Sequence, residues 1–488
     1  MFRPHSRRAM TSKFELKSEH LKNYPHFDAP LSKREIMRLV TDKRRVAQNT
    51  FYPLFLYNEE WQPYRSVNGP KPDKKSRPIR YGARRDAYIF TYYRHLLSGP
   101  YERRLKTLGI EGCPIAYRKI PKPGSNSGKC NIDFAKDAFE AIDHLKDCVA
   151  IALDIEGYFE NLDHSMIKSG WRDLLGAPEL PEDHYAVFRN ITKYHYVDQR
   201  EVYRRLGFIK SIKVGASKID QFTVPYRKMP KQLCKPEEFR AKICGYDPAY
   251  SNLVESNKSG RGIPQGAPIS DLIANFYLLD FDVSANDFVK SRGGFYMRYS
   301  DDILLILPGA AREADDAVNF VKDEIKRYGS ELRIKDKKTC VVQFRRDGPS
   351  LRHEHIYGPQ GRNGLEYLGF RYDGKRVYIR DSTISRLYRK VSIAAKREAA
   401  RHVRDNKSLG LKELKDSFNY SLLSQRFARV QKEHLSSDYR SWTFYTYLKR
   451  ASATFGRKGN RILGQARRFD ALMRLRVNAA IDKAYYKR

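Results

Sequence analysis

The sequence lacks the features of a membrane protein and of a small protein stabilised by disulfides or zinc. No apolar run approaches the ~18–20 residues that a membrane-spanning helix needs. The six cysteines are scattered and none belongs to a C-x-x-C pair, which argues against a zinc ribbon or a disulfide scaffold and fits a reducing compartment. No apolar stretch typical of a signal peptide follows the basic N-terminus. We therefore expect a soluble, cytoplasmic protein.

Acidic side chains are also in short supply. The 488 residues include 57 Asp and Glu against 93 Lys and Arg, which gives a formal net charge of +36. A small acidic molecule cannot neutralise this surplus, so the composition favours a nucleic acid partner. Hydrophobic residues make up 41% of the chain, enough to bury a core, which excludes wholesale disorder. At roughly 100–200 residues per domain, the length indicates two to four structural units.

The pattern of apolar residues predicts short strands separated by helices. Helices are expected around 33–49, 84–108, 134–145, 269–281 and 311–328. Strands are expected at 148–153, 295–299, 303–307, 365–370 and 376–379. From residue 382 onward the pattern is helical, basic and free of proline. The order favours an α+β fold with a mainly antiparallel sheet and a helical C-terminal region.

Two adjacent carboxylates, Asp301 and Asp302, lie between the apolar segments 295–299 and 303–307, at the tip of the predicted hairpin. Carboxylates that share a site repel each other and resist desolvation, so such a pair between buried strands needs a cause. A solvated turn is one interpretation, since Asp is common in turns. The other is a divalent metal site, because Mg²⁺ prefers hard oxygen ligands.

A third carboxylate, Asp154, ends the apolar run 148–153. A carboxylate at the end of a buried strand is well placed to meet a hairpin on a neighbouring strand. With Asp301 and Asp302 it would hold two metal ions ~3.5–4 Å apart, the arrangement that activates a 3′-hydroxyl and neutralises a leaving pyrophosphate. The competing candidates lie beyond the strand end; they are Glu156, Glu160 and Asp163.

A loop rich in glycine and proline, residues 262–270, precedes an apolar helix. Glycine and proline shape a tight turn before a helix N-terminus, and Gly266 after Gln265 lets the backbone approach a nucleotide closely. Alone, such a loop is a weak signal.

Together and in this order, the three motifs resemble those of reverse transcriptases. The resemblance rests on the Tyr-x-Asp-Asp box at 299–302, on Asp154 followed five residues later by an aromatic, and on the Pro-Gln-Gly loop at 264–266. It covers roughly residues 70–380 and implies a right-hand polymerase fold. On this division, 1–60 is an N-terminal basic helical extension and 61–150 the fingers. Residues 151–380 are the palm, with an insertion at about 171–260, and 381–488 are a helical thumb or C-terminal domain.

The resemblance implies roles for the residues of these motifs. Asp154, Asp301 and Asp302 correspond to the catalytic carboxylates that bind two Mg²⁺ ions, with Mn²⁺ as an alternative. Ile155 joins them in the implied metal-binding set. Phe159 corresponds to the aromatic gate that excludes a 2′-hydroxyl and so selects deoxynucleotides.

Other implied residues contact the nucleotide or the nucleic acid. The nucleotide-binding set is Arg77, Arg80, Phe159, Gln265, Gly266 and Lys338. The nucleic-acid-binding set is Arg118 of the 116–118 box, Tyr367 and Gly369 of a primer-grip hairpin, and Lys449 and Arg450. Guanidinium forks suit phosphate oxygens, although Arg84 and Arg85 are alternatives in the fingers and a solvated basic face is a further interpretation. Lys335 and Lys337 compete with Lys338.

The compact chain most resembles the stand-alone bacterial reverse transcriptases of antiphage defence, which are related to retron and group II intron enzymes. No RNase H pattern follows the palm. The resemblance implies cDNA synthesis from a cognate non-coding RNA template, with dNTPs as substrates, DNA as product and no membrane; homo-oligomerisation stays open. The alternatives are a retron or intron-type reverse transcriptase or maturase, a non-catalytic RNA chaperone, and template-independent or protein-primed synthesis from Tyr485 or Tyr486.

Overall fold

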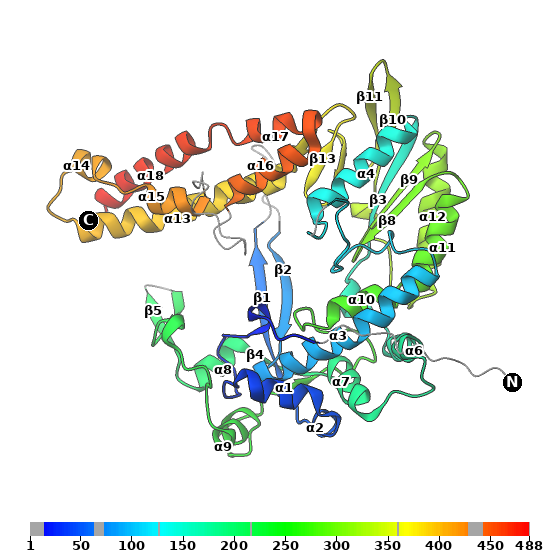
Figure 1. Cartoon of the computed structure of the whole chain (residues 1–488). Helices are drawn as coiled ribbons and strands as arrows, with labels where there is room; N and C mark the ends of the chain where they lie inside the picture. Colours follow the sequence, from blue (N-terminus) through cyan, green and yellow to red (C-terminus); the bar gives the residue numbers. More distant parts are fainter. Residues whose placement is uncertain are drawn as a thin grey trace.

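The computed structural model describes residues 14–62, 73–124, 127–214, 217–358, 361–427 and 443–487. Helices and antiparallel sheets make up the first four fifths of the chain, and a group of helices completes it (Figure 1). The α+β architecture expected from the sequence is confirmed, with its helical C-terminal region. Within the described ranges, no helix is long and apolar enough to cross a membrane.

A five-stranded antiparallel sheet in the order β11-β10-β3-β9-β8 forms the centre of the molecule. Its strands are β3 (Cys148–Asp154), β8 (Phe295–Tyr299), β9 (Asp302–Pro308), β10 (Cys340–Asp347) and β11 (Ser350–Tyr357). Successive side chains of a strand point to opposite faces. Accordingly, Val149 and Ile151 of β3 enter one hydrophobic core, and Cys148 and Ala150 enter the other. Because both faces are covered, β3 is apolar along its whole length until Asp154.

Helices from three parts of the chain cover this sheet. α4 (Asn131–Leu145) packs on one face, where Phe134 and Phe139 join Ala150 in one core. α11 (Leu279–Lys290) and α12 (Arg312–Lys326) pack on the other, with Phe281 and Val321 in the core of Ile151. Further helices of this half are α5 (Tyr158–Asn161), α6 (His164–Leu175), α7 (Glu182–Thr192) and α10 (Ser270–Tyr277).

A second sheet, in the order β2-β1-β4-β7, lies beside the long helix α3 (Arg84–Thr107). β1 (Leu54–Trp61) pairs with β2 (Lys75–Tyr81) in antiparallel fashion and with β4 (His195–Asp198) in parallel fashion; β7 (Glu255–Ser256) pairs with β4. β4 and β7 come from the segment 171–260 that the sequence suggested as an excursion from the palm. Part of that segment therefore completes the sheet built by β1 and β2, which corrects the picture of one separate surface insertion.

The rest of this segment is a small subdomain. It holds α8 (Gln199–Arg205), the two-stranded sheet of β5 (Ile209–Val214) and β6 (Ser217–Phe222), and α9 (Pro236–Glu238). Phe55 of β1 packs with Val197 and Tyr203 in a third core, so the subdomain is anchored to the second sheet. The N-terminal helices α1 (Lys33–Thr41) and α2 (Lys43–Ala47) lie nearby, against α3 and α7.

The C-terminal region begins with a small sheet of β12 (Leu365–Tyr367), β13 (Phe370–Tyr372) and β14 (Val377–Ile379). α13 (Asp381–Asp405) then runs alongside α18 (Phe469–Tyr485) (Figure 1). Between and beside them lie α14 (Leu411–Asp416), α15 (Ser421–Phe427), α16 (Phe444–Phe455) and α17 (Asn460–Gln465). The Asn131 amide donates to the Tyr447 hydroxyl at 3.1 Å, and Lys458 pairs with Asp143. These polar contacts attach the C-terminal helical region to α4.

One fully buried ion pair joins the edge of the central sheet to α11. Arg298 on β8 donates from Nε to Asp282 Oδ1 at 2.7 Å and from Nη2 to Asp282 Oδ2 at 2.5 Å, and both side chains are 0% exposed. The Tyr296 hydroxyl donates to the same carboxylate at 2.7 Å. Two further guanidinium N–H groups donate to the carbonyls of Asn275 and Ser300. Four of the five guanidinium N–H groups and both carboxylate oxygens therefore have partners, which is what permits two charges in a core.

We predict that Asp282→Ala lowers the free energy of unfolding by about 3–5 kcal/mol, because it leaves the Arg298 charge buried without a partner. Denaturant titration followed by circular dichroism measures the loss. The control is Asp323→Ala, whose carboxylate pairs with Lys326 at 2.9 Å on the surface and contributes about 0.3–0.5 kcal/mol. Equal losses in the two variants would contradict a special role for the buried pair.

Candidate active site

Three carboxylates meet at one end of the central sheet. Asp154 at the end of β3 lies directly opposite Asp302 at the start of β9 in the antiparallel register. Residues directly opposite each other in such a pair present their side chains on the same face. Asp301 occupies the tight turn between β8 and β9, and its carbonyl accepts a hydrogen bond of 3.1 Å from the Ile155 backbone N–H. Segments 150 residues apart in the chain thus bring their acids together.

The turn that carries the acids has an unusual backbone. Ser300 has φ of +59°, in the left-handed region that side chains other than glycine seldom adopt. Its carbonyl is held by the Arg298 guanidinium at 3.0 Å. The buried ion pair described above therefore stabilises the strained residue immediately before Asp301. Strain of this kind persists only where surrounding contacts impose it, and it concentrates at functional sites.

The acids repel one another. Burial, followed by repulsion from Asp301 and Asp154, raises the pKa of Asp302 to about 7. Burial also raises the pKa of Asp301, and the charge of Asp154 adds to the increase, while Lys338 and Arg77 oppose it. The Lys338 ammonium lies 2.6 Å from Asp154 Oδ2. Lys338 therefore neutralises part of the negative charge, and the remaining charge still favours a further cation.

Divalent metal ions suit this donor set. Carboxylates that repel one another are hard oxygen ligands of the kind that Mg²⁺ and Mn²⁺ take. Asp154 is buried, Asp301 is half-buried and Asp302 is exposed, and their side chains are the ones that would hold the ions; Ile155, whose side chain is buried in the core, has only its carbonyl to offer. With the side chains as they stand, no group of three or more His, Cys, Asp or Glu in the part of the chain that the structure describes is placed to hold a metal ion.

The loop at 262–270 is clamped from two sides. The Gln265 carbonyl accepts a 2.8 Å hydrogen bond from the Arg80 N–H of β2, and the Phe159 carbonyl of α5 accepts one from Ile263 N–H, also at 2.8 Å. Gly266 has φ of +126°, and a Cβ there would lie 2.7 Å from the Arg80 carbonyl oxygen. Glycine is required because the loop lies directly on the β2 backbone. Phe159, half-buried, lies at the junction of this loop and the end of β3.

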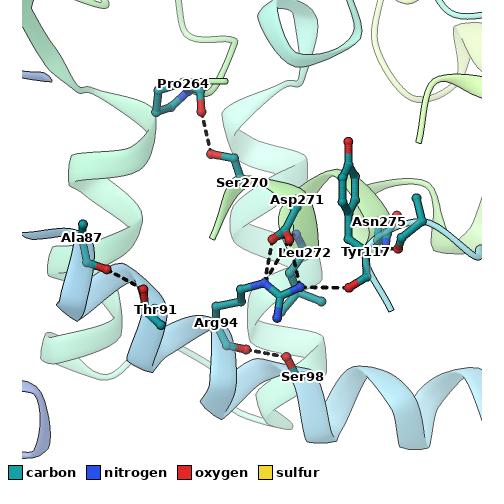
Figure 2. A network of polar contacts seen from close by, with 11 residues as sticks. Ala87, Thr91, Arg94, Ser98, Tyr117, Pro264, Ser270, Asp271, Leu272 and Asn275 are labelled. Atoms are coloured by element: carbon teal, nitrogen blue, oxygen red, sulfur yellow. Dashed lines mark hydrogen bonds and ion pairs between the residues drawn. The ribbon is translucent and has the colours of Figure 1, made fainter. Parts of the chain in front are cut away.

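A polar network fixes the helix that follows the loop (Figure 2). Arg94 of α3 donates from Nε to Asp271 Oδ1 at 2.8 Å and from Nη2 to Asp271 Oδ2 at 2.8 Å. Its Nη2 also donates to the Tyr117 carbonyl at 3.0 Å. At the start of α10 the Ser270 hydroxyl donates to the Pro264 carbonyl at 2.8 Å. The bidentate Arg94–Asp271 pair therefore connects α3, the loop and the 116–118 segment.

Two of the arginines expected to contact ligands are committed to the scaffold. The Arg118 side chain is 5% exposed and donates to both carboxylate oxygens of Glu102 and to two backbone carbonyls. Its donors already have partners within the protein, so the expected nucleic-acid contact of Arg118 stays a prediction that would require these bonds to change. Arg80 pairs with Glu160 at 2.7 Å and is 11% exposed, so it holds β2 against α5 instead of presenting a free fork. Arg77 is exposed, and its charge reaches Asp301.

The hairpin of the 365–370 segment lies next to the acids. Tyr367 is buried, and its phenol has no hydrogen-bond partner among the described residues. Burial raises the pKa of this phenol, and the charge of Asp302 adds to the increase. Leu368 and Gly369 have φ of +46° and +90°, the pair of positive values that a two-residue type I′ turn requires. Because Tyr367 is buried, the turn itself is the exposed part of this hairpin.

The two basic residues expected on the C-terminal helices lie on α16. Lys449 is exposed beside the Tyr445 ring, while Arg450 is half-buried and lies 3.8 Å from Asp133 of α4. Lys449 is therefore the freer of the two to meet a ligand.

Tyr117 is a residue of the site that the motifs did not reveal. Its side chain is 43% exposed, its φ is +60°, and its ring centroid lies 6.1 Å from that of Tyr299 in the acidic box. The Asn275 amide donates to the Ala116 carbonyl at 2.6 Å, which fixes the strained segment. The 116–118 box therefore presents its tyrosine and buries its arginine. A tyrosine with a left-handed backbone leaves no recognisable local pattern in the sequence, so the motifs gave no signal for Tyr117.

Comparison with protein families places part of this site in a known class. Residues 217–372 match the family described as reverse transcriptase (RNA-dependent DNA polymerase). The matched range contains Asp301, Asp302, the loop at 262–270 and Tyr367, while Asp154 lies before it. Residues 217–372 are therefore similar to a reverse transcriptase domain.

Comparison with solved structures finds telomerases. Apo telomerase from Candida tropicalis has 11% identity and a TM-score of 0.39, over 90% of this chain and 63% of that one. Its form truncated from the C-terminal domain has 12% identity and a TM-score of 0.34, over 70% and 58%. Telomerase from Candida albicans, in complex with a TWJ fragment of telomeric RNA, has 12% identity and a TM-score of 0.36, over 93% and 66%. The chain thus spans less than two thirds of each of these structures. Comparison with curated proteins finds no match.

We predict that Gly266→Ala lowers the rate of DNA synthesis by 10- to 100-fold. The added Cβ would displace the loop from β2 by a fraction of an ångström to an ångström, and misplacements of that size carry such losses. Steady-state primer extension measures the rate. Gly464→Ala on α17 is the control, because nothing lies within 4 Å of its Cβ. Equal rates in the two variants would show that the loop does not position the substrate.

Proposed function

We propose that this chain is an RNA-directed DNA polymerase that uses Asp154, Asp301 and Asp302 to hold two divalent metal ions. One observation carries the proposal: three carboxylates from β3 and the β8–β9 turn meet at one end of a buried sheet, in a chain with a net charge of +36. A binding protein gains nothing from acids that repel both one another and the ligand. The reverse transcriptase match at 217–372 supports the same conclusion.

The surrounding residues divide the work of binding. When bound, the metal ions would favour the ionised 3′-hydroxyl of a primer and neutralise the leaving pyrophosphate. Lys338, 2.6 Å from Asp154, holds that carboxylate in place and is positioned to donate to a phosphate oxygen. Arg77 adds an exposed charge on the fingers side. The loop at 262–270 offers backbone and the Gln265 side chain to the nucleotide and its template.

We further propose that the template is a cognate non-coding RNA and that the cDNA serves antiphage defence. The support is the likeness of the motifs and of the compact architecture to stand-alone bacterial reverse transcriptases. A retron or intron-type enzyme remains the closest alternative. Protein priming by Tyr485 or Tyr486 gains no support from geometry, because α18 ends at the tip of the helical region that lies far from the central sheet (Figure 1).

We predict that the double variant Asp301→Asn/Asp302→Asn loses more than 100-fold of primer extension on poly(rA)·oligo(dT) with dTTP and Mg²⁺, because the amides cannot replace the charge that the metal ions require. Its affinity for the template–primer should stay within threefold of wild type. The control is Asp323→Asn, an exposed carboxylate on α12. Full synthesis by the double variant would refute the metal assignment.

We predict that Phe159→Ala raises the incorporation of ribonucleotides relative to deoxynucleotides by at least tenfold. The ring lies half-buried beside the end of β3, where it would meet a 2′-hydroxyl, and its removal opens that space. Competition between rUTP and dTTP in single-nucleotide extension measures the ratio. Phe320→Ala, which removes a ring stacked on Phe288 away from the acids, serves as the control. An unchanged ratio would exclude Phe159 as the gate.

A further inference from the structure

The β5–β6 hairpin belongs to the small subdomain that also holds α8 and α9. In Figure 1 it lies on the side of the β1–β2 hairpin opposite to the central sheet. One face of the hairpin covers α8: Asp220 pairs with Arg204 at 2.9 Å, and the rings of Phe222 and Tyr203 lie 6.2 Å apart. The other face carries the cross-strand pair Ile212 and Ile219, which are 39% and 48% exposed. No role in the proposed catalytic site accounts for this hairpin.

Positive charge dominates this part of the chain. Between positions 199 and 228 the sequence has eight Lys or Arg and two acids, Glu201 and Asp220. Both acids are already engaged: Glu201 pairs with Arg204, and Asp220 with Arg204 and Arg200. The exposed charges left over are all basic; among the described side chains they are Lys210, Lys213, Arg227 and Lys228.

Aromatic rings are exposed among these charges. Phe222 is 43% exposed, Tyr226 is 47% exposed, and their centroids lie 6.5 Å apart. Tyr57 of β1, 38% exposed, lies close enough to Tyr226 to influence the pKa of its phenol. Between α8 and the hairpin a hollow of about 730 Å³ is lined by Tyr203, Phe222, Ile209, Ile219 and polar side chains. A ligand pocket typically measures roughly 300–1,000 Å³.

A surface of rings and basic side chains, in which the acids of 199–228 are already paired, matches single-stranded nucleic acid. Lys and Arg track the phosphates, while exposed rings stack on bases, which a duplex keeps stacked on each other. A hairpin with exposed apolar residues and no ligand would promote aggregation of the protein, so such a surface is expected to bind something. We propose that this surface, formed by Tyr57, Phe222, Tyr226, Lys213, Arg227 and Lys228, binds an unpaired stretch of RNA.

The proposal rests on the proposed function for the identity of the ligand, since RNA is the template of the reverse transcriptase class. Its position suits an unpaired template strand that approaches along the outer side of the β1–β2 hairpin before it reaches the acids. The hairpin would then hold template ahead of the nucleotide being copied, and its contribution would be to binding, with no step of the chemistry assigned to it.

The test uses the full-length protein without Mg²⁺ and without dNTPs. Fluorescence anisotropy compares a labelled 20-nucleotide oligouridylate with a blunt 20-base-pair RNA duplex. Phe222→Ala/Tyr226→Ala should raise the Kd for the oligouridylate at least tenfold and leave the Kd for the duplex within twofold. Phe222→Leu/Tyr226→Leu, which keeps apolar bulk but removes the ring faces, should show the same split with an unchanged melting temperature. Tyr246→Ala, an aromatic 76% exposed on another part of the surface, is the control.

The charges are tested by salt dependence. Lys213→Gln/Lys228→Gln should lower the slope of log Kd against log salt concentration by about 1–1.5, since each phosphate contact to a single strand contributes about 0.7. Equal weakening for single strand and duplex, or an unchanged Kd for the oligouridylate, would overturn the proposal. So would a change of oligomeric state in the Leu variant, because the surface would then be an interface between copies.

Failure of this proposal is distinguishable from failure of the proposed function. If the oligouridylate Kd is unaffected while wild type extends primers, the RNA surface is wrong and the polymerase assignment stands. If wild type makes no DNA but the aromatic variants lose single-strand binding selectively, the RNA surface stands without the polymerase.

Discussion

The buried pair of Arg298 and Asp282 is the contact on which the catalytic end of the central sheet depends. Its two charges have no access to water, so each is tolerable only while the other is present and the pair is hydrogen-bonded. The guanidinium also donates to the Ser300 carbonyl, so it holds the left-handed residue that precedes Asp301 in the two-residue turn. The buried pair and the position of Asp301 are therefore linked through this one carbonyl.

The site holds its acids under mutual repulsion instead of relieving it. Lys338 neutralises part of the charge of Asp154, yet burial and repulsion still raise the pKa of Asp302 to about 7. At an ionic strength of 0.15 M charges farther than about 8 Å are largely screened, so the basic surfaces elsewhere cannot compensate. A cluster left under-neutralised in this way would favour a bound cation, as the proposed function requires.

Sequence reasoning located what local pattern encodes. The apolar runs at 148–153, 295–299 and 303–307 are bounded by acids or turn residues, so their strands were predictable to within a residue, and antiparallel pairing then brings Asp154 opposite Asp302. The parallel pairing of β1 with β4 was not predictable, because its partners are some 140 residues apart and neither strand has a distinctive period. The burial of Arg118 and the exposure of Tyr117 were not predictable for a related reason: which of two adjacent residues is buried depends on Glu102 and Asn275, contributed by other helices.

The net charge of +36 separates binding from chemistry. A polyanion is drawn to the basic surfaces whether or not metal is present, since phosphates replace counterions there. The same phosphates are repelled by Asp154, Asp301 and Asp302, whose charge Lys338, Arg77 and Arg380 offset only in part. Nucleic acid bound without metal would therefore rest on the fingers and the C-terminal helices while its reacting end stays clear of the acids. A divalent cation removes that last repulsion, so occupancy of the acid cluster, more than affinity for the nucleic acid, would decide when the bound chain can react.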